Sequence, residues 1–193
     1  MKICIGIPTR GRIHALQANA LIGIWEDRRY VKELFFSINS RSVEESRNFV
    51  ASQFLKSDCD YLLSMDDDVV PLKNPLDLVK LDLDIIGLPV PVVRGKGISY
   101  GAYQEKEGKY PDYPKKEGLQ EVDAISGGCM LIARRVLENL DKPFSALYNE
   151  QGLWALSEDL NFCKRAKEKG FKIFAHFNYP CQHYSDVELS SLI

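Results

Sequence analysis

Three consecutive aspartates at positions 66–68 are the residues of this chain best suited to chemistry. They directly follow the apolar residues 61–63, which predict a buried strand, and burying neighbouring carboxylates without a partner is costly. A divalent cation resolves that conflict, because Mg²⁺ and Mn²⁺ prefer carboxylate oxygens. Since α/β proteins bind ligands where parallel strands end, the pattern predicts a metal site facing a substrate. The structural alternative is a solvated turn, which is the commoner role of an acidic run.

Two positions late in the chain could complete such a site. His183 is the best candidate for a nitrogen ligand, and imidazole suits Mn²⁺ better than Mg²⁺. Glu158 and Asp159 open a predicted helix, where a carboxylate that faces the cleft could act as a general base. The alternatives are a histidine that only makes structural hydrogen bonds, and acidic residues that only stabilise the helix dipole.

Basic and aromatic side chains add a second kind of candidate. Arg10 and Arg12 follow the first predicted strand, and Arg47 lies on the helix after the second. Arginines in such places could grip a diphosphate, because a guanidinium binds phosphate oxygens in pairs. Trp154 and Tyr148 could form a stacking platform for a sugar ring. Surface exposure and ordinary packing are the alternatives for these five residues.

The first half of the chain alternates strands and helices. Predicted strands cover residues 2–7, 33–39, 61–64 and 84–90, and predicted helices cover residues 13–26, a segment opened by a capping box at Ser42, and residues 75–81. Crossovers of this length favour right-handed, parallel pairing, so this half is predicted to be Rossmann-like. It lacks the glycine fingerprint that binds dinucleotides. The first helix is indicated by its apolar positions at Leu16, Ala20, Ile22, Ile24 and Trp25. The apolar face of the second is predicted at Phe49, Val50, Phe54 and Leu55.

The second half begins with a segment of different character. Residues 94–121 are rich in Gly, Lys, Tyr and Glu, and predict a mobile loop or a small hairpin over the sheet edge. After it, the pattern predicts strands at residues 129–133 and 171–175, and helices at residues 134–140 and from Ser157 to a terminating Gly170. In the last helix, Leu160, Cys163 and Ala166 are predicted to face inward.

Length, composition and charge limit the classes of protein to which this chain can belong. The 193 residues suit one domain, with 45% hydrophobic and 27% charged residues. A formal charge of −2 argues against nucleic acid as a partner. The five cysteines are widely spaced without a C-x-x-C pair, which favours free thiols in a reducing compartment. No apolar run is long enough for a signal peptide or a transmembrane segment, so we predict a cytoplasmic protein that is at most membrane-peripheral.

Several segments, in order along the chain, resemble the nucleotide-sugar glycosyltransferases of GT-A fold, in particular the large inverting family with many small bacterial and viral members. The resembling segments are residues 7–12 (IPTRGR), 46–48 (SRN), 63–68 (LSMDDD), 126–131 (SGGCML) and 157–163 (SEDLNFC), with His183 following. The resemblance implies an α/β fold with one Rossmann-like GT-A domain over residues 1–193. Its mostly parallel central sheet would be flanked by helices and carry a small additional antiparallel element. Residues 1–92 would form the nucleotide-binding half, 93–121 a variable loop, and 122–193 the acceptor-binding and catalytic half.

The resemblance also implies roles for single residues. The catalytic pair would be Asp159, as general base, with Glu158; the metal, Mn²⁺ or Mg²⁺, would bind at Asp66, Asp68 and His183. Nucleotide-sugar contacts are assigned to Pro8, Thr9, Arg10, Arg12, Asn39, Arg47, Asp66 and Asp67, and acceptor contacts to Gly127, Gly128 and Trp154. The family often places an Asp after the second strand to read uracil. Here that segment contains Ser37 and Asn39 and no Asp, so either of these two residues is a candidate to contact the base. This leaves the preference for a nucleotide base open.

The implied reaction is transfer of a sugar, with inversion, from a nucleoside-diphosphate sugar to an acceptor hydroxyl. A UDP-sugar is the favoured donor, and the acceptor is a glycan, a lipid-linked sugar or a small molecule. Two alternatives remain open. A sugar-1-phosphate nucleotidyltransferase shares the architecture, although it would need a glycine-rich phosphate loop after the first strand. A non-catalytic sugar-binding domain is the other.

Overall fold

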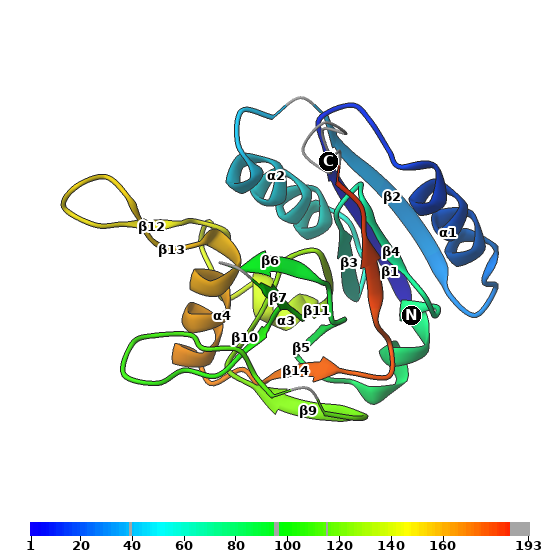
Figure 1. Ribbon diagram of the computed structural model, residues 1–193. Helices are drawn as coiled ribbons and strands as arrows, with labels where there is room; N and C mark the ends of the chain where they lie inside the picture. Colours follow the sequence, from blue (N-terminus) through cyan, green and yellow to red (C-terminus); the bar gives the residue numbers. More distant parts are fainter. Residues whose placement is uncertain (39, 95–96, 115, 186–193) are drawn as a thin grey trace, which may run out of the picture.

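The computed structural model describes residues 1–38, 40–94, 97–114 and 116–185 (Figure 1). Its centre is a sheet with strand order β2-β1-β3-β11-β5-β14-β9. Strands β2, β1, β3, β5 and β14 run in one direction, whereas β11 and β9 run in the other. This mostly parallel sheet confirms the predicted fold class. The bounds are β1 (Lys2–Thr9), β2 (Val31–Ile38), β3 (Tyr61–Met65), β5 (Ile85–Gly87), β9 (Leu119–Val122), β11 (Cys129–Ala133) and β14 (Ile173–His176).

Two helices connect the first three strands. Helix α1 (Ala15–Glu26) joins β1 to β2, and α2 (Val43–Lys56) joins β2 to β3. Because β2 and β3 lie on opposite sides of β1, right-handed connections place the two helices on opposite faces of the sheet. Helix α2 lies close to β1 at Gly6, where an added Cβ would overlap Val50. Glycine is therefore required there for the helix to approach the strand.

Ser42 caps helix α2 as predicted. Its hydroxyl accepts a hydrogen bond from the backbone N–H of Glu45 at 3.2 Å. The Glu45 carboxylate reaches back to the backbone N–H of Arg41, one residue before the cap, at 2.8 Å. The hydrogen bond from the Glu45 N–H to Ser42 confirms one of the two bonds of the predicted capping box. In the other, the Glu45 carboxylate accepts from the N–H of Arg41 rather than from that of Ser42.

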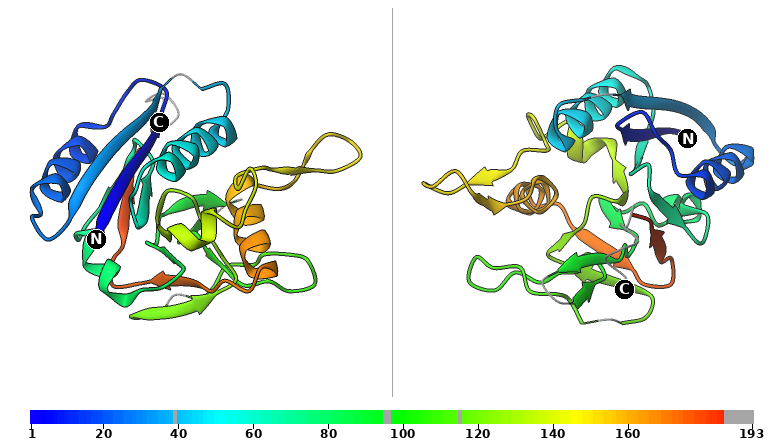
Figure 2. Two further views of the ribbon diagram at one scale, coloured as in Figure 1. Left: turned by 180° about the vertical axis from the view of Figure 1, so that it is seen from behind. Right: turned by 45° about the horizontal axis from the view of Figure 1, so that its top comes forward.

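The remaining elements lie outside the central sheet, and most of them are short. Strands β4 and β15 pair with each other, as do β6 with β7, β8 with β10, and β12 with β13. The β12–β13 hairpin and the chain between β8 and β9 both project from the body beside α4 (Figures 1 and 2). The bounds are β4 (Val69–Pro71), η1 (Pro75–Leu81), β6 (Val92–Arg94), β7 (Gly97–Ser99), β8 (Ala102–Tyr103), β10 (Ala124–Ile125), α3 (Arg134–Leu137), β12 (Leu147–Tyr148), β13 (Trp154–Leu156), α4 (Glu158–Glu168) and β15 (Cys181–His183).

Three features of the topology differ from the sequence prediction. The fourth predicted strand is shorter, since β5 ends at Gly87 before the two prolines Pro89 and Pro91. It does not pair with β3, because the antiparallel β11 lies between them. The β6–β7 hairpin extends into residues 94–121, in line with one of the two alternatives, and this segment also supplies most of β9, which was not predicted.

The buried faces of the helices were predicted only in part. Val50 and Phe54 of α2 are buried, as expected, since they lie about 40° apart around a helix with 100° per residue. The other members of the predicted set point to different sides of the helix. In α4, Cys163 and Ala166 are buried as predicted, and Leu160 is partly buried and packs against the core. Among the apolar residues named for α1 and α2 in the sequence, those that are exposed are Leu16, Ile22, Trp25, Phe49 and Leu55.

All five cysteines are buried and unpaired. Within the described ranges, no helix has both the length and the apolar character that crossing a bilayer requires.

Candidate active site

The aspartate loop after β3 is held by backbone hydrogen bonds from three sides. The Asp66 N–H donates to the Gly128 carbonyl at 2.9 Å, which ties the loop to the start of β11. The Asp67 carbonyl accepts from the N–H of His14, just before α1, at 2.9 Å, and the Asp68 carbonyl accepts from the N–H of Tyr184 at 3.0 Å. The loop is therefore fixed before any ligand binds.

His183 is brought beside Asp68 by the pairing of β4 with β15, in which His183 lies opposite Val69. The His183 Nδ1 is 2.8 Å from the carbonyl oxygen of Pro91. Because a carbonyl can only accept, Nδ1 carries the proton, which leaves Nε2, on the other side of the ring, as the nitrogen that can bind a metal. That Nε2 is 3.5 Å from Asp68 Oδ2. A backbone carbonyl that fixes the tautomer in this way is typical of a metal-binding histidine.

The residues at this place suit a divalent cation. Burial raises the pKa of the Asp68 carboxyl, with Asp66 and Asp67 adding to the shift and His183 opposing it. A cation between Asp68 and His183 would reverse that penalty on the charged carboxylate. The donor set of carboxylate oxygen and imidazole nitrogen suits Mn²⁺ well.

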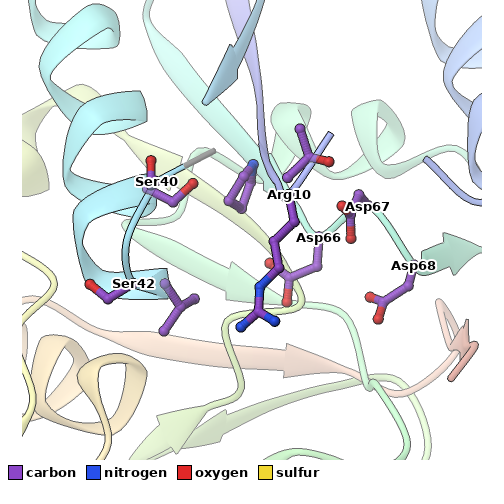
Figure 3. A pocket seen from close by; sticks show the side chains of 10 residues that line it. Arg10, Ser40, Ser42, Asp66, Asp67 and Asp68 are labelled. Atoms are coloured by element: carbon purple, nitrogen blue, oxygen red, sulfur yellow. The ribbon is translucent and has the colours of Figure 1, made fainter. Parts of the chain in front are cut away.

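A pocket of about 450 Å³ lies over the aspartates (Figure 3). Arg10 extends into it from the loop after β1, and Ser40 and Ser42 lie on the side of α2 (Figure 3). Arg12, predicted to join this group, is exposed and does not line the pocket, while Asn39 lies outside the described residues. The lining residues are Pro8, Thr9, Arg10, Ser40, Ser42, Val43, Ser46, Asp66, Asp67 and Asp68.

The serines of this pocket were missed by sequence reasoning. Ser42 was interpreted only as a helix cap, Ser46 only as part of the SRN segment at residues 46–48, and Ser40 was given no role. Their place in the chain could have identified them. They lie between the end of β2 and the first turn of α2, and β2 is the neighbour of β1 in the sheet. Hydroxyl groups there can hydrogen-bond a polar ligand seated over the aspartates.

A second cavity of about 810 Å³ adjoins the first, with Val43 and Asp66 lining both. It collects predicted residues from both halves of the chain, which are far apart in sequence. Those that line it are Arg47, Asp66, Gly127, Gly128, Trp154, Glu158, Asp159 and His183. Residues that were not predicted also line it, among them Val69, Val90, Val92, Val93, Arg94, Tyr103, Ser126, Ser157 and Leu160.

Arg47 is a buried bridge between the two halves of this site. Its Nη2 lies 2.9 Å from both carboxylate oxygens of Asp66, and its Nη1 donates to Glu158. Its side chain is only 5% exposed. Although burial acts to lower the pKa of Arg47, the charges of Asp66 and Glu158 raise it. Burial raises the pKa of Glu158, against the opposing effect of Arg47.

Asp159 faces the same cavity with its carboxylate held by three donors. Oδ2 accepts from the N–H of Gly127 at 2.9 Å, and Oδ1 accepts from the N–H of Leu160 at 2.8 Å and from the Ser157 hydroxyl. These bonds orient a half-buried carboxylate at the start of α4. Asp159 therefore stabilises the start of the helix, which was the structural alternative. It also presents a carboxylate oxygen to the cavity that could accept a proton.

A different group of metal-ligand types lies far from these cavities. Glu33, Asp58 and Cys59 place ligand atoms within 4.8 Å of one another, at the amino end of β3. Asp58 is ion-paired with Lys2 and exposed. Nothing else there indicates a ligand.

Comparisons with known proteins bear on the fold. No protein-family model and no curated protein sequence matches the chain. Among solved structures, A197 from STIV is similar, with a TM-score of 0.70 and 21% identity over 96% of this chain and 87% of that chain. GalNAc-T7 with UDP, GalNAc and Mn²⁺ has a TM-score of 0.61 and 11% identity over 97% of this chain. The chain has a GT-A-type glycosyltransferase fold.

A third similar structure belongs to TarS of S. aureus (residues 1–349) in complex with UDP-GlcNAc. Its TM-score is 0.56, with 16% identity over 99% of this chain. The chain spans only part of the two transferases named here, covering 44% of the GalNAc-T7 chain and 61% of the TarS chain. At these identities the GT-A-type fold is what the chain shares with them.

Proposed function

We propose that this chain is a metal-dependent glycosyltransferase that moves a sugar from a nucleoside-diphosphate sugar to an acceptor hydroxyl with inversion. The observation that carries the proposal is that Asp66, His183 and Asp159 line one cavity. A candidate metal site and a candidate base thus face the same enclosed space. UDP is the favoured nucleotide, and the structures of GalNAc-T7 with UDP and of TarS with UDP-GlcNAc support that choice.

The pocket over the aspartates would hold the nucleotide. It provides Arg10 as a cation for the diphosphate and serine hydroxyls at the start of α2. Arg47 does not line this pocket, and both of its terminal nitrogens are bound to carboxylates. We therefore assign Arg47 to positioning Asp66 and Glu158 rather than to direct nucleotide binding.

Asp68 and His183 would hold the divalent ion, with Asp66 kept in place beside them by Arg47. When bound, the ion neutralises negative charge on the diphosphate leaving group. Arg10 adds positive charge on the same side. This arrangement favours departure of the diphosphate.

Asp159 would act as general base in the transfer step. Its carboxylate takes the proton of the acceptor hydroxyl while that oxygen forms a bond to the anomeric carbon. The bond from the anomeric carbon to the diphosphate oxygen breaks, and the nucleoside diphosphate leaves with the electron pair. Attack from the face opposite the leaving group inverts the anomeric centre, so the product anomer tests this assignment.

Metal removal is the first test. We expect EDTA to abolish release of UDP from a UDP-sugar panel, and added Mn²⁺ to restore it. His183→Ala should raise the Mn²⁺ concentration needed for half-maximal rate by about 10- to 100-fold, a size seen when one metal-binding partner is lost. His176→Gln, which changes a histidine outside both cavities, is the matched control.

The same assay separates the other candidate functions. A non-catalytic sugar-binding domain would release no UDP at any Mn²⁺ concentration. A nucleotidyltransferase would release pyrophosphate from a nucleoside triphosphate and a sugar 1-phosphate. If His183→Ala has the same Mn²⁺ dependence as the unsubstituted protein, His183 does not bind the metal.

Gly127 offers a test of the Arg47 bridge. An added Cβ at Gly127 would overlap the Arg47 guanidinium, which two carboxylates hold in place. We expect Gly127→Ala to shift Arg47 and lower the kcat of transfer by up to about 10²-fold, because small displacements of reacting groups are costly. Gly23→Ala is the control, since an added Cβ there meets nothing within 4 Å. A fully active Gly127→Ala enzyme would contradict the positioning role.

A further inference from the structure

A third cavity extends the candidate active site outward. It has a volume of about 620 Å³ and lies between β13 and the projecting chain at residues 106–111. It shares Arg94, Trp154, Ser157 and Leu160 with the cavity that contains Asp159. The two cavities therefore form one groove that begins at the candidate base and runs away from the aspartates.

Trp154 lies where the two cavities join. Its side chain is 65% exposed, although it is one of the two largest apolar side chains in the sequence. On the β12–β13 hairpin it pairs with Tyr148, which is 53% exposed. Cross-strand partners project from the same face of a hairpin, so the two aromatic rings occupy one face. This indole is available to a ligand in the groove rather than to the hydrophobic core.

The rest of the outer cavity combines charged groups with apolar and aromatic side chains, among them Tyr110, Pro111 and Leu156. Arg94, Lys106, Glu107 and Lys109 line it, together with backbone at Gly108. Charged side chains and backbone groups hydrogen-bond hydroxyl groups well, but they do not favour an acyl chain. A sugar ring suits such a surface, because its C–H face can cover an indole while its hydroxyl edge meets polar groups. An acyl chain has no group that could hydrogen-bond the side chains of Lys106, Glu107 and Lys109.

We propose that the acceptor is an oligosaccharide of at least two rings. The terminal ring places its hydroxyl at Asp159, and the following ring lies against Trp154 and enters the outer cavity. The transfer step in this proposal rests on the proposed function, whereas binding of the oligosaccharide along the groove does not. Acceptors of one ring would use the inner cavity alone and lose the contact with Trp154.

Fluorescence gives a direct test of binding. The chain has two tryptophans, Trp25 and Trp154, so Trp25→Phe leaves Trp154 as the only indole. We would titrate this variant with linear hexasaccharides of glucose (α- and β-linked), N-acetylglucosamine and mannose, and with the matching monosaccharides. The expected result is a saturable change in emission with at least one hexasaccharide, and a weaker response to its monosaccharide.

The matched variant Trp154→Phe keeps only Trp25, which lies on α1 outside all three cavities. Its emission should not respond to the same sugar. Thermal unfolding of both variants checks that they are folded. If no hexasaccharide changes the emission of Trp154, or if mono- and hexasaccharide act equally, the proposed subsite is wrong.

Kinetics give a second, separate readout. With the hexasaccharide as acceptor, Trp154→Ala should raise KM about 10-fold, the size expected for losing one stacked ring, with a smaller change in kcat. The KM for a monosaccharide acceptor should change much less. Sugar binding without any UDP release would contradict the proposed function, but it would still support binding of the oligosaccharide along the groove. UDP release without a change in Trp154 emission would contradict only the proposal that an oligosaccharide binds along the groove.

Discussion

Asp159→Asn should lower the kcat for sugar transfer by about 10²- to 10⁴-fold, the usual contribution of a general base. The substitution keeps one oxygen, which can accept from the N–H of Leu160 at the start of α4, while the amide nitrogen replaces the oxygen that now accepts from the N–H of Gly127. It removes the group that takes the acceptor proton. Steady-state transfer to an oligosaccharide, with UDP release as the signal, measures the loss.

Two controls make this result specific. UDP binding by Asp159→Asn should be close to that of the unsubstituted protein, because Asp159 does not line the pocket over the aspartates. Asp141→Asn changes an exposed carboxylate outside these cavities and should leave kcat unchanged. A transfer rate in Asp159→Asn within a few-fold of the unsubstituted enzyme would place the base elsewhere.

The sequence located most of the candidate site but not how its parts meet. Asp68 and His183 could each be identified as possible ligands from residue type and position. Their proximity depends on β4 pairing with β15, in a register that sets His183 opposite Val69. Short strands with little periodicity give no local signal for such a pairing. The fold class, by contrast, follows from the strand–helix alternation in the first half of the chain.

Arg47 shows where interpretation by residue type fails. An arginine after the second strand suggests a diphosphate contact, and the sequence gives no sign that this one is buried. Its burial results from α2 lying close to β1 at Gly6, and from the return of α4, more than a hundred residues later, with Glu158. Ion-pair partners so far apart in sequence become visible only in three dimensions. The same holds for Trp154, whose role depends on which cavity the β12–β13 hairpin borders.

Arg47→Ala should be the most destabilising single change in the site. It would leave Asp66 and Glu158 as neighbouring carboxylates without their shared cation, and the Glu158 side chain is only 7% exposed. Removing one partner of a buried ion pair typically lowers the free energy of unfolding by about 3–5 kcal/mol. Equilibrium unfolding in urea measures the change.

Arg135→Ala is the matched control, because Arg135 also bridges two carboxylates, Asp82 and Asp84, but its side chain is 46% exposed. Solvent screens such a pair, so we expect a much smaller loss of stability. Combining Arg47→Ala with Glu158→Gln should recover part of the loss, since the double variant no longer buries an unpaired carboxylate at position 158. Equal losses in Arg47→Ala and Arg135→Ala would show that the buried bridge does not hold the two halves of the site together. Recovery of stability without recovery of transfer would instead separate the stabilising role of Arg47 from its positioning of Asp66 and Glu158.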